Sequence, residues 1–286
     1  MYLLAIANFK GDTLILTQNE SNYQVINVVG LNPPPAQINT TTGANLDGAT
    51  FNSSRLNTRN IVITVKINGN VETNRQNLYR FFPTKQPCTI YYVNENRNVF
   101  IEGYVETVEC NLFTNNEQMQ ISVICPQPYF KSLNEMLDDI SNTVSQFVFP
   151  FSINIGSPVP FSTHQSARIT NVYNDSDSET GMTIVIAFFD SINSVMIRNV
   201  DNGDTFTLNY NFLENDVVTI NTGRGEKSVT LLRDGTSTNI FGAVQKGSAF
   251  LQLSTGDNHF GYMADNGSND DDVTIVIKHR TLYRGV

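Results

Sequence analysis

The 286-residue sequence contains no tryptophan, only three histidines and only three cysteines. The cysteines are Cys88, Cys110 and Cys125, an odd number without a C-x-x-C spacing. Neither a disulfide framework nor a zinc knuckle is therefore indicated, and the thiols are expected to be reduced.

Few side chains in the sequence are suited to catalysis, and the motifs Gly-x-Ser-x-Gly and His-Glu-x-x-His are absent. His164, His259 and His279 are predicted in turns or at strand ends without a paired nucleophile motif. Glu102 and Glu106 fall on one face of a predicted strand, where solvated charges explain them as well as acid–base chemistry on sugars does. We predict no enzyme, no catalytic or cofactor-binding residue and no cofactor.

Basic residues are scarce, with 18 Lys and Arg against 27 Asp and Glu. Residues 131–286 hold 10 basic and 18 acidic side chains, whereas residues 1–130 hold 8 and 9. A surface of this sign repels phosphate backbones, so no direct nucleic-acid binding is expected.

Long hydrophobic runs are also missing. The first residues, MYLLAIANFKGD, lack a positively charged segment before a short apolar run. No later stretch approaches the length of about 20 apolar residues that crosses a bilayer. We therefore expect a soluble chain without a membrane partner, not exported through a secretory signal.

The sequence does have many short runs of Val, Ile, Phe and Tyr separated by turn residues, which indicates an all-β fold. In RNIVITVKING, Ile61, Ile63, Val65 and Ile67 alternate with residues of the opposite face and predict a half-buried strand. The next stretch, VETNRQNLYRFFP, predicts a short helix that Pro83 ends.

The thiol of Cys125 closes another alternating row, formed by Met119, Ile121 and Val123. No histidine or lysine lies nearby in the sequence to lower the pKa of this thiol. Cys125 is therefore interpreted as a small buried hydrophobic residue and not as a reactive thiol.

Residues 30–48, GLNPPPAQINTTTGANLDG, are predicted to lack regular structure. Three prolines remove ladder donors, and the remainder is rich in turn residues. We expect a long ordered loop or a projecting arm.

The first domain is predicted to cover residues 1–131, and Pro126 and Pro128 are predicted to end its sheet. The next stretch, KSLNEMLDDISNTVSQ, predicts a linker helix over residues 132–147, with Ser132 as the N-cap and Glu135 at the capping-box position. Residues 148–286 then contain a series of short strands about ten residues apart, which is typical of a β-sandwich or jelly roll.

The stretch DSDSETG places Asp175, Asp177 and Glu179 at alternate positions, a spacing that suggests metal ligation. An EF-hand loop starting at Asp175 needs glycine at its sixth position and glutamate at its twelfth, where this sequence has Thr180 and Ile186. A polar turn is favoured over a metal site, both here and in DNGSNDDD (265–272).

The order of these features resembles the distal tail proteins of bacteriophages with long non-contractile tails. In the first half the similar stretches are TRNIVITVKING, NRQNLYRFF, FIEGYVETVEC and NEQMQISVICPQPYF. In the second half they are ARITNVYNDSDSETGMTIVI, DNGDTFTLNYNFLENDVVTINT, SAFLQLSTGDNHFGY and VTIVIKHRTLYRGV.

This resemblance implies two β-sandwich-like domains: an amino-terminal ring-forming, tail-tube-like domain over 1–131 and a galectin-like domain over 148–286. It implies a structural virion protein at the phage tail tip, assembled in the host cytoplasm. The protein would be a homo-hexameric adaptor that joins the tail tube protein to the baseplate hub or a tail-associated fibre protein. Edge strands and the arm at 30–48 would pack across subunits.

The alternative function is a carbohydrate-binding module for adhesion to the host wall, because galectin-like folds often hold sugars. Such sites stack the sugar on tryptophan, which this chain lacks. Tyr173, Tyr210, Phe260 and Tyr262 are the residues that could provide another aromatic platform.

Overall fold

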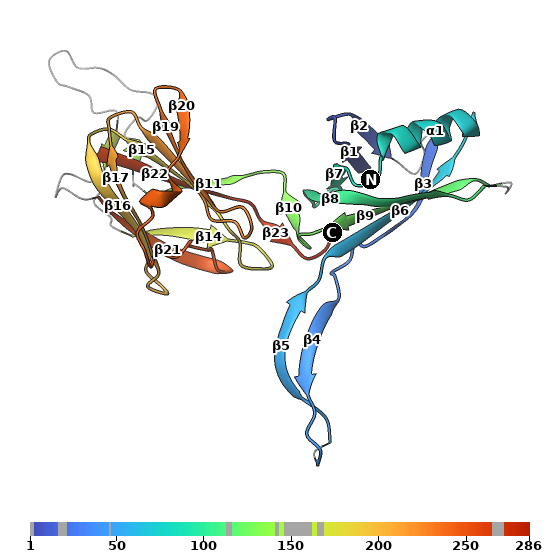
Figure 1. The fold of residues 1–286 in the computed structure, drawn as a ribbon, viewed down its shortest axis with the longest axis horizontal. Helices are drawn as coiled ribbons and strands as arrows, with labels where there is room; N and C mark the ends of the chain where they lie inside the picture. The colour runs from blue at the N-terminus through green and yellow to red at the C-terminus, as the bar shows by residue number, and fades with distance from the viewer. Residues whose placement is uncertain are drawn as a thin grey trace. The chain divides into compact units, whose positions relative to one another are not determined.

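A computed structural model describes residues 3–16, 22–45, 47–112, 116–140, 143–145, 162–164, 169–264 and 272–286 (Figure 1). The chain forms two compact units: unit 1 contains Met1–Leu133 and Leu282–Val286, and unit 2 contains Asn134–Thr281. Nearly all of the described elements are β-strands. The predicted all-β fold class is confirmed.

Unit 1 is built on a nine-stranded antiparallel sheet, with one helix and a separate two-stranded ribbon. Its elements are β1 (Leu3–Ala7), β2 (Thr13–Leu16), β3 (Tyr23–Val29), β4 (Ala36–Thr41), β5 (Thr50–Leu56), β6 (Arg59–Ile67), α1 (Val71–Phe81), β7 (Pro87–Val93), β8 (Asn98–Cys110), β9 (Gln118–Cys125), β10 (Phe130–Ser132) and β23 (Leu282–Tyr283). The sheet runs β2-β1-β7-β8-β9-β6-β3, and β10 pairs with both β8 and β23. Two distant parts of the chain thus complete one sheet.

Alternation in the sequence sets the inward faces of β6 and β9, which are neighbours in the sheet. The inward residues are at most 3% exposed and form one core cluster. They are Ile61, Ile63, Val65, Ile67, Met119, Ile121, Val123 and Cys125. Burial of each large aliphatic side chain stabilises the fold by about 1.5–3 kcal/mol. The predicted inward row of β9, including Cys125, is confirmed.

Helix α1 begins and ends where the sequence predicted. The side chain of Asn70 accepts a hydrogen bond from the Thr73 backbone N–H at 3.2 Å, which caps the first turn. Leu78 and Phe82 anchor the helix in the core of unit 1, and Pro83 follows. No helix among the described residues has the length and apolar character needed to cross a membrane.

The predicted linker helix at 132–147 is wrong in the part that the structure describes. Ser132 ends β10, and β11 (Met136–Asp139) and β12 (Thr143–Ser145) follow as strands. β11 pairs in register with β22 (Val273–His279), and this pairing overrides a helical pattern of apolar residues. Leu137 is 63% exposed while Ile140 is buried, so the helical stripe is not used as one packing face.

The prediction that residues 30–48 lack regular structure is also wrong, although the projecting arm is present. β4 and β5 form a two-stranded ribbon that extends from the sheet of unit 1 (Figure 1). The prolines lie before β4 and not inside it, so they remove no donor from the ribbon. We call residues 36–56 the arm.

Unit 2 contains a six-stranded and a four-stranded antiparallel sheet. Besides β11, β12 and β22, its elements are β13 (Ser162–His164), β14 (Thr170–Asn174), β15 (Thr183–Phe188), β16 (Ile192–Asn199), β17 (Thr205–Phe212), β18 (Val217–Asn221), β19 (Ser228–Arg233), β20 (Thr236–Asn239), the 3-10 turn η1 (Phe241–Ala243) and β21 (Gly256–Ala264). The sheets run β11-β22-β15-β18-β19-β20 and β14-β21-β16-β17, and β12 pairs with β13.

The two larger sheets of unit 2 share one hydrophobic core. Phe188 of β15 stacks on Phe212 of β17 with ring centroids 4.3 Å apart, so a ring from each sheet meets in the core. Alternating residues of β15 and β22, such as Ile186 and Ile275, are fully buried. This is the sandwich that the strand spacing predicted.

The pairing of β23 with β10 predicts that residues 282–286 stabilise unit 1. Two fragments are compared: residues 1–133 alone, and the same residues joined through a flexible linker to residues 282–286. The fragment without residues 282–286 is expected to melt at least roughly 6 °C lower, because it lacks about 2 kcal/mol of pairing and packing free energy. Circular dichroism melts of both fragments measure the difference. A third fragment with the linker and five serines is the control, and equal midpoints for all three contradict the prediction.

Candidate assembly surface

The side chain of Arg59 gathers the segments at the base of the arm. Arg59 begins β6 and is 2% exposed. Its hydrogen-bond acceptors among the described residues are main-chain carbonyls. Its Nε donates to Pro128 O at 2.7 Å and its Nη1 to Asn32 O at 2.8 Å. Nη1 also donates to Gly30 O, and Nη2 donates to Arg284 O. We call these five residues the Arg59 cluster.

Aromatic stacking completes the environment of this guanidinium. The Phe130 ring lies 4.6 Å from the guanidinium carbon, a distance typical of a cation–π contact. Burial lowers the pKa of Arg59 from its ordinary value, but an arginine remains charged at neutral pH. A buried cation held by carbonyl dipoles therefore joins the arm base, the β9–β10 connection and residue 284.

Residues 282–286 pack directly against the start of the arm. The Val286 N–H donates to Leu31 O at 3.2 Å, and a Cβ on Gly285 would lie 2.8 Å from the Pro33 ring. The guanidinium of Arg97 lies 4.0 Å from the Tyr283 ring centroid. These contacts fix residues 282–286 against unit 1.

The arm leaves the sheet through Gly30, whose backbone has φ +96°. A Cβ at this position would lie 2.2 Å from the carbonyl oxygen of Asn60. Only glycine fits both the backbone angle and the space, so the direction in which the arm leaves unit 1 is set by the fold.

One face of the arm is covered by hydrogen bonds between side chains of its two strands. The donors and acceptors form three cross-strand pairs, Arg55 with Gln37, Asn39 with Ser53, and Asn52 with Thr41. Such pairs hold the strands in register although every one of them is exposed. The polar face of the arm is thus satisfied within the chain.

Sequence reasoning missed Arg59, although the sequence contained a signal. Counting back from Ile61 and Ile63 in steps of two, Arg59 falls on the inward face of β6. A charged residue on an inward row must find buried partners. The partners lie far away in the sequence, at residues 128 and 284, and the alternation alone could not identify them.

The three cysteines are free thiols. Cys125 and Cys88 are buried, and burial raises their pKa to about 12 and about 11. Burial also raises the pKa of the less buried Cys110. A protonated thiol is a poor nucleophile, so the environment of Cys125 agrees with its interpretation as a buried hydrophobic residue.

The two candidate carboxylates accept hydrogen bonds within the described structure. Glu102 accepts from Lys131 Nζ at 2.8 Å, and Glu106 accepts from Ser122 Oγ at 2.9 Å. His279 is buried, and burial lowers its pKa against the opposing effect of Asp138, whose oxygen lies 3.3 Å from Nε2. The side chain of His164 lies outside the described residues.

The three weak metal candidates do not form a cluster. Glu179 accepts a hydrogen bond from Arg224 Nη2 at 2.9 Å. Within the described part of the chain, Asp175, Asp177 and Glu179 belong to no group of three or more His, Cys, Asp or Glu side chains able to hold a metal ion. The other candidate loop, at 265–272, lies outside the described residues except for its last position.

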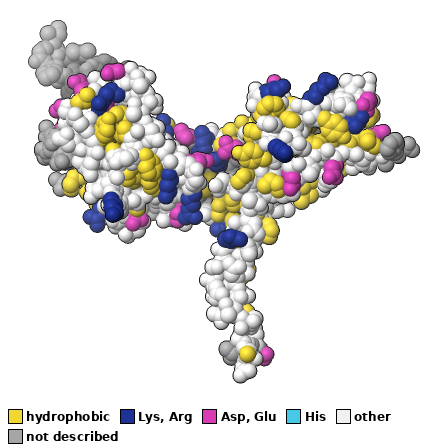
Figure 2. All heavy atoms as spheres, in the orientation of Figure 1, with side chains coloured by type: hydrophobic (Ala, Val, Ile, Leu, Met, Phe, Trp, Pro, Cys, Tyr) yellow, Lys and Arg dark blue, Asp and Glu magenta, His cyan; other side chains and the backbone are white. Residues whose placement is uncertain are grey.

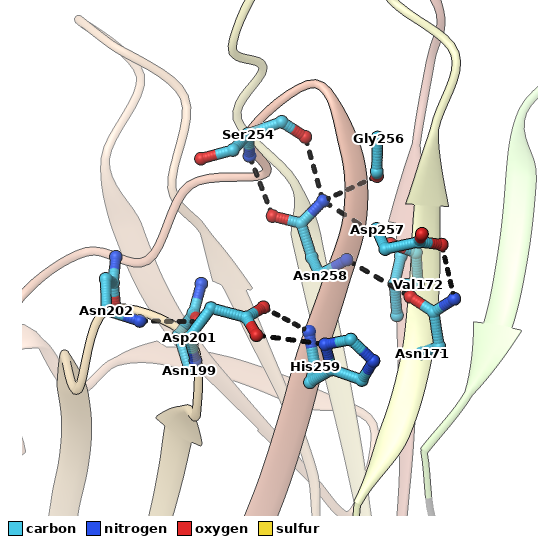
Figure 3. Close-up of polar contacts among 10 residues, drawn as sticks. All are labelled: Asn171, Val172, Asn199, Asp201, Asn202, Ser254, Gly256, Asp257, Asn258 and His259. Carbon is cyan, nitrogen blue, oxygen red and sulfur yellow. Dashed lines mark hydrogen bonds and ion pairs between the residues drawn. The ribbon is translucent and has the colours of Figure 1, made fainter.

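Polar residues gather at one end of β14 and β21 in unit 2 (Figure 3). The buried Asn258 donates to Ser254 O and Gly256 O at 2.8 and 2.9 Å, which closes the turn before β21. Asp201 accepts from the His259 backbone N–H and also contacts the His259 ring at 2.9 Å. These groups hold the turns to the sheet by bonding to one another.

The aromatic residues proposed as a sugar platform are separated by the fold. Phe260 is fully buried in the core, and Tyr210 and Tyr262 pack against the core. Only Tyr173, which is 58% exposed, stands on the surface. The platform expected for the carbohydrate-binding alternative is therefore not assembled from these four residues.

Comparison with known proteins matched both units. Residues 15–125 match the family of the phage tail protein RIFT-related domain, and residues 175–281 match that of the siphovirus-type tail component, C-terminal domain. A search of curated proteins found no match.

Solved structures share the fold over nearly the whole chain. One of them is the Dit protein of phage SPP1, described as a paradigm of the hub adsorption apparatus in phages that infect Gram-positive bacteria. It is 14% identical to this chain, with a TM-score of 0.71, and the match covers 98% of this chain and 99% of that one. A chain of the phage p2 baseplate in its activated conformation with Ca is 12% identical, with a TM-score of 0.55 and 98% of both chains covered.

The fold, the arm and these matches define a structural component of the phage tail and baseplate. Within this class, the chain belongs to the siphophage distal tail protein family. The resemblance inferred from the sequence is confirmed.

Replacing Arg59 tests the cluster at the arm base. Arg59→Met is expected to lower the free energy of unfolding of unit 1 by about 3 kcal/mol or more, since buried carbonyls at residues 30, 32, 128 and 284 lose their donor. Arg55→Met, on the exposed arm, is the matched control and should change stability by about 0.5 kcal/mol or less. Denaturant unfolding of the full chain measures both, and equal effects of the two variants contradict the role of the cluster.

The buried thiols predict a loss of stability at high pH. The pKa values of Cys88 and Cys125 in the folded chain are about 11 and about 12, above the ordinary value of 9.0. The contribution of each thiol to the free energy of unfolding is therefore complete below pH 9 and is lost as the pH rises through its folded pKa. Cys125→Ala should destabilise the chain at pH 8, and its deficit should shrink above pH 9 by up to about 1.4 kcal/mol per pH unit. Urea unfolding of both chains from pH 8 to 11 measures the deficit, and a constant deficit refutes the assignment.

Proposed function

We propose that this chain forms a hexameric ring at the distal end of a siphophage tail and joins the tail tube to the baseplate hub. The observation that carries the proposal is the match of both units, in order, to two tail-protein families. The likeness over 98% of the chain to a protein described as part of a hub adsorption apparatus supports it.

Charge is divided between the units in a way that favours a ring built from unit 1. Unit 1 holds ten basic and nine acidic side chains, which gives it a net charge of +1. Unit 2 holds eight basic and eighteen acidic side chains, which gives it a net charge of −10. Copies of unit 1 can approach one another without strong repulsion, whereas close contacts between copies of unit 2 bring like charges together. The ring contacts are therefore expected from unit 1 and not from unit 2.

The mechanism is assembly, without catalysis and without a cofactor. The ring binds the tail tube protein on one side and the baseplate hub or a tail-associated fibre protein on the other. It needs no contact with nucleic acid or membrane, and it assembles in the host cytoplasm before it becomes part of the virion.

The ring predicts the mass of the purified chain in solution. Six copies of 31.9 kDa give a particle of about 191 kDa, or about twice this mass if two rings stack. Light scattering over a wide concentration range measures the mass, and negative-stain images should show closed rings. A chain that stays monomeric and binds a host-wall saccharide would instead favour the carbohydrate-binding alternative.

A further inference from the structure

The outer side of the four-stranded sheet of unit 2 carries a group of polar side chains around one tyrosine. β14 pairs with β21 so that Asn171 lies opposite His259 and Tyr173 lies opposite Asp257. Directly opposed residues of an antiparallel pair lie on the same side of the sheet, and the residues that alternate with these four are buried. We call Asn171, Tyr173, Asp257 and His259 the β14–β21 face.

The two ionisable side chains of this face, Asp257 and His259, are each held by a partner. Asp201, in the turn after β16, accepts from the His259 backbone N–H at 2.8 Å and lies 2.9 Å from the ring Nδ1. Asn171 accepts from the Asn258 backbone N–H at 3.1 Å and donates to Asp257 Oδ1 at 2.6 Å. The imidazole and the carboxylate are therefore fixed in orientation before any ligand arrives (Figure 3).

The polar atoms that these bonds leave unused include both acceptors and donors. A carboxylate beside Nδ1 favours the tautomer with its proton on that atom, so Nε2 of His259 is left as an acceptor. Asp257 accepts from Asn171 through Oδ1, which leaves Oδ2 as a second acceptor. Arg198 of β16 lies opposite Gly261, the second residue after His259, and its exposed guanidinium adds donors on the same side of the sheet.

Tyr173 adds an aromatic ring beside these polar atoms. It is 58% exposed and is the cross-strand neighbour of Asp257. A tyrosine side chain combines an apolar ring with a hydroxyl group, and a pyranose sugar combines an apolar C–H side with hydroxyl groups that both donate and accept. The ring and the polar atoms together match a sugar better than a wholly apolar or a wholly ionic partner.

We propose that the β14–β21 face, together with Arg198, binds a neutral saccharide. Sugar hydroxyls donate to Asp257 Oδ2 and His259 Nε2 and accept from Arg198. The C–H side of the sugar packs on the ring of Tyr173. A component of the phage tail and baseplate meets such saccharides on the surface of the host cell. All of these residues belong to unit 2, so the inference does not depend on the proposed ring.

The charges of unit 2 favour a neutral ligand over an ionic one. Unit 2 is acidic overall, which disfavours a polyanion, and Arg198 disfavours a cationic partner on this face. Among the described residues, Asp201, Asp257 and His259 belong to no group able to hold a metal ion. On the side of unit 2 that Figure 2 shows, the described acidic side chains are interspersed with basic ones. The acidity of the unit therefore repels a polyanion without singling out a cationic partner.

A glycan array probed with the labelled full chain tests the site. The array carries neutral oligosaccharides of glucose, galactose, N-acetylglucosamine and rhamnose, with sialylated and phosphorylated oligosaccharides as the charged comparison. The chain is expected to retain at least one neutral oligosaccharide, in high salt and with a chelator present, since neither net charge nor a metal ion contributes. No retention, retention of charged oligosaccharides alone, or loss of binding in high salt or with the chelator each overturns the proposal.

Two substitutions and a matched control assign the binding to this face. Tyr173→Ala should weaken binding of the retained oligosaccharide on the order of tenfold. Asp257→Asn, which keeps an acceptor for Asn171, should weaken it roughly tenfold or more. Phe189→Ala is the control, because Phe189 is 55% exposed and follows β15 in the other sheet. Titration calorimetry measures the affinities, and circular dichroism melts verify that each variant is folded.

Two results of the titrations contradict the site: wild-type affinity in both test variants, or an equal loss of affinity in the control. The mass of each variant is measured in parallel, so that the site and the ring are tested separately. A ring that binds no neutral oligosaccharide contradicts this inference and leaves the ring standing. A monomer that binds one through Tyr173 contradicts the ring and leaves this inference standing.

Discussion

The buried guanidinium of Arg59 is the interaction on which the geometry of unit 1 depends. Its partners are four carbonyl groups from three separate segments, and only arginine offers five donors in a planar fork to reach them. A buried charge without such bonds would cost several kcal/mol. The fold therefore keeps these segments together, and the position of each one constrains the others.

This cluster links three segments of unit 1. The cluster holds Gly30 and Asn32, where the chain leaves the sheet for the arm. It also holds Pro128, which precedes unit 2 in the sequence, and Arg284, which follows unit 2. Unit 2 is thus an insertion whose two connections both end in unit 1. In the ring proposed above, contacts between nearly neutral copies of unit 1 would keep the charge of the acidic unit 2 out of the ring contacts.

Local patterns predicted the parts of the fold that depend on local physics. Alternation in β6 and β9 and the apolar side and terminating proline of α1 were read correctly, because burial of one face and helix termination by proline are encoded by neighbouring residues. The ribbon of the arm and strand β11 were not, because cross-strand partners decided their conformation. The pairing of Leu282 and Tyr283 with β10 joins residues about 150 positions apart and leaves no local signal.

The candidate site was predictable only in outline. The prolines and turn residues indicated an arm, but its two faces follow from a register that includes the bulge at Asn52. Asp175, Asp177 and Glu179 alternate in the sequence like metal ligands, but they lie in the bends that follow β14, and Glu179 accepts a hydrogen bond from Arg224. Arg59 was identifiable by its inward position, and its partners emerged only from the tertiary structure.

An electron cryomicroscopy reconstruction of the assembled full-length chain tests the central claim most directly. The proposed function predicts a six-fold ring whose subunit contacts are made by unit 1. A ring whose subunit contacts are made by unit 2 would contradict it.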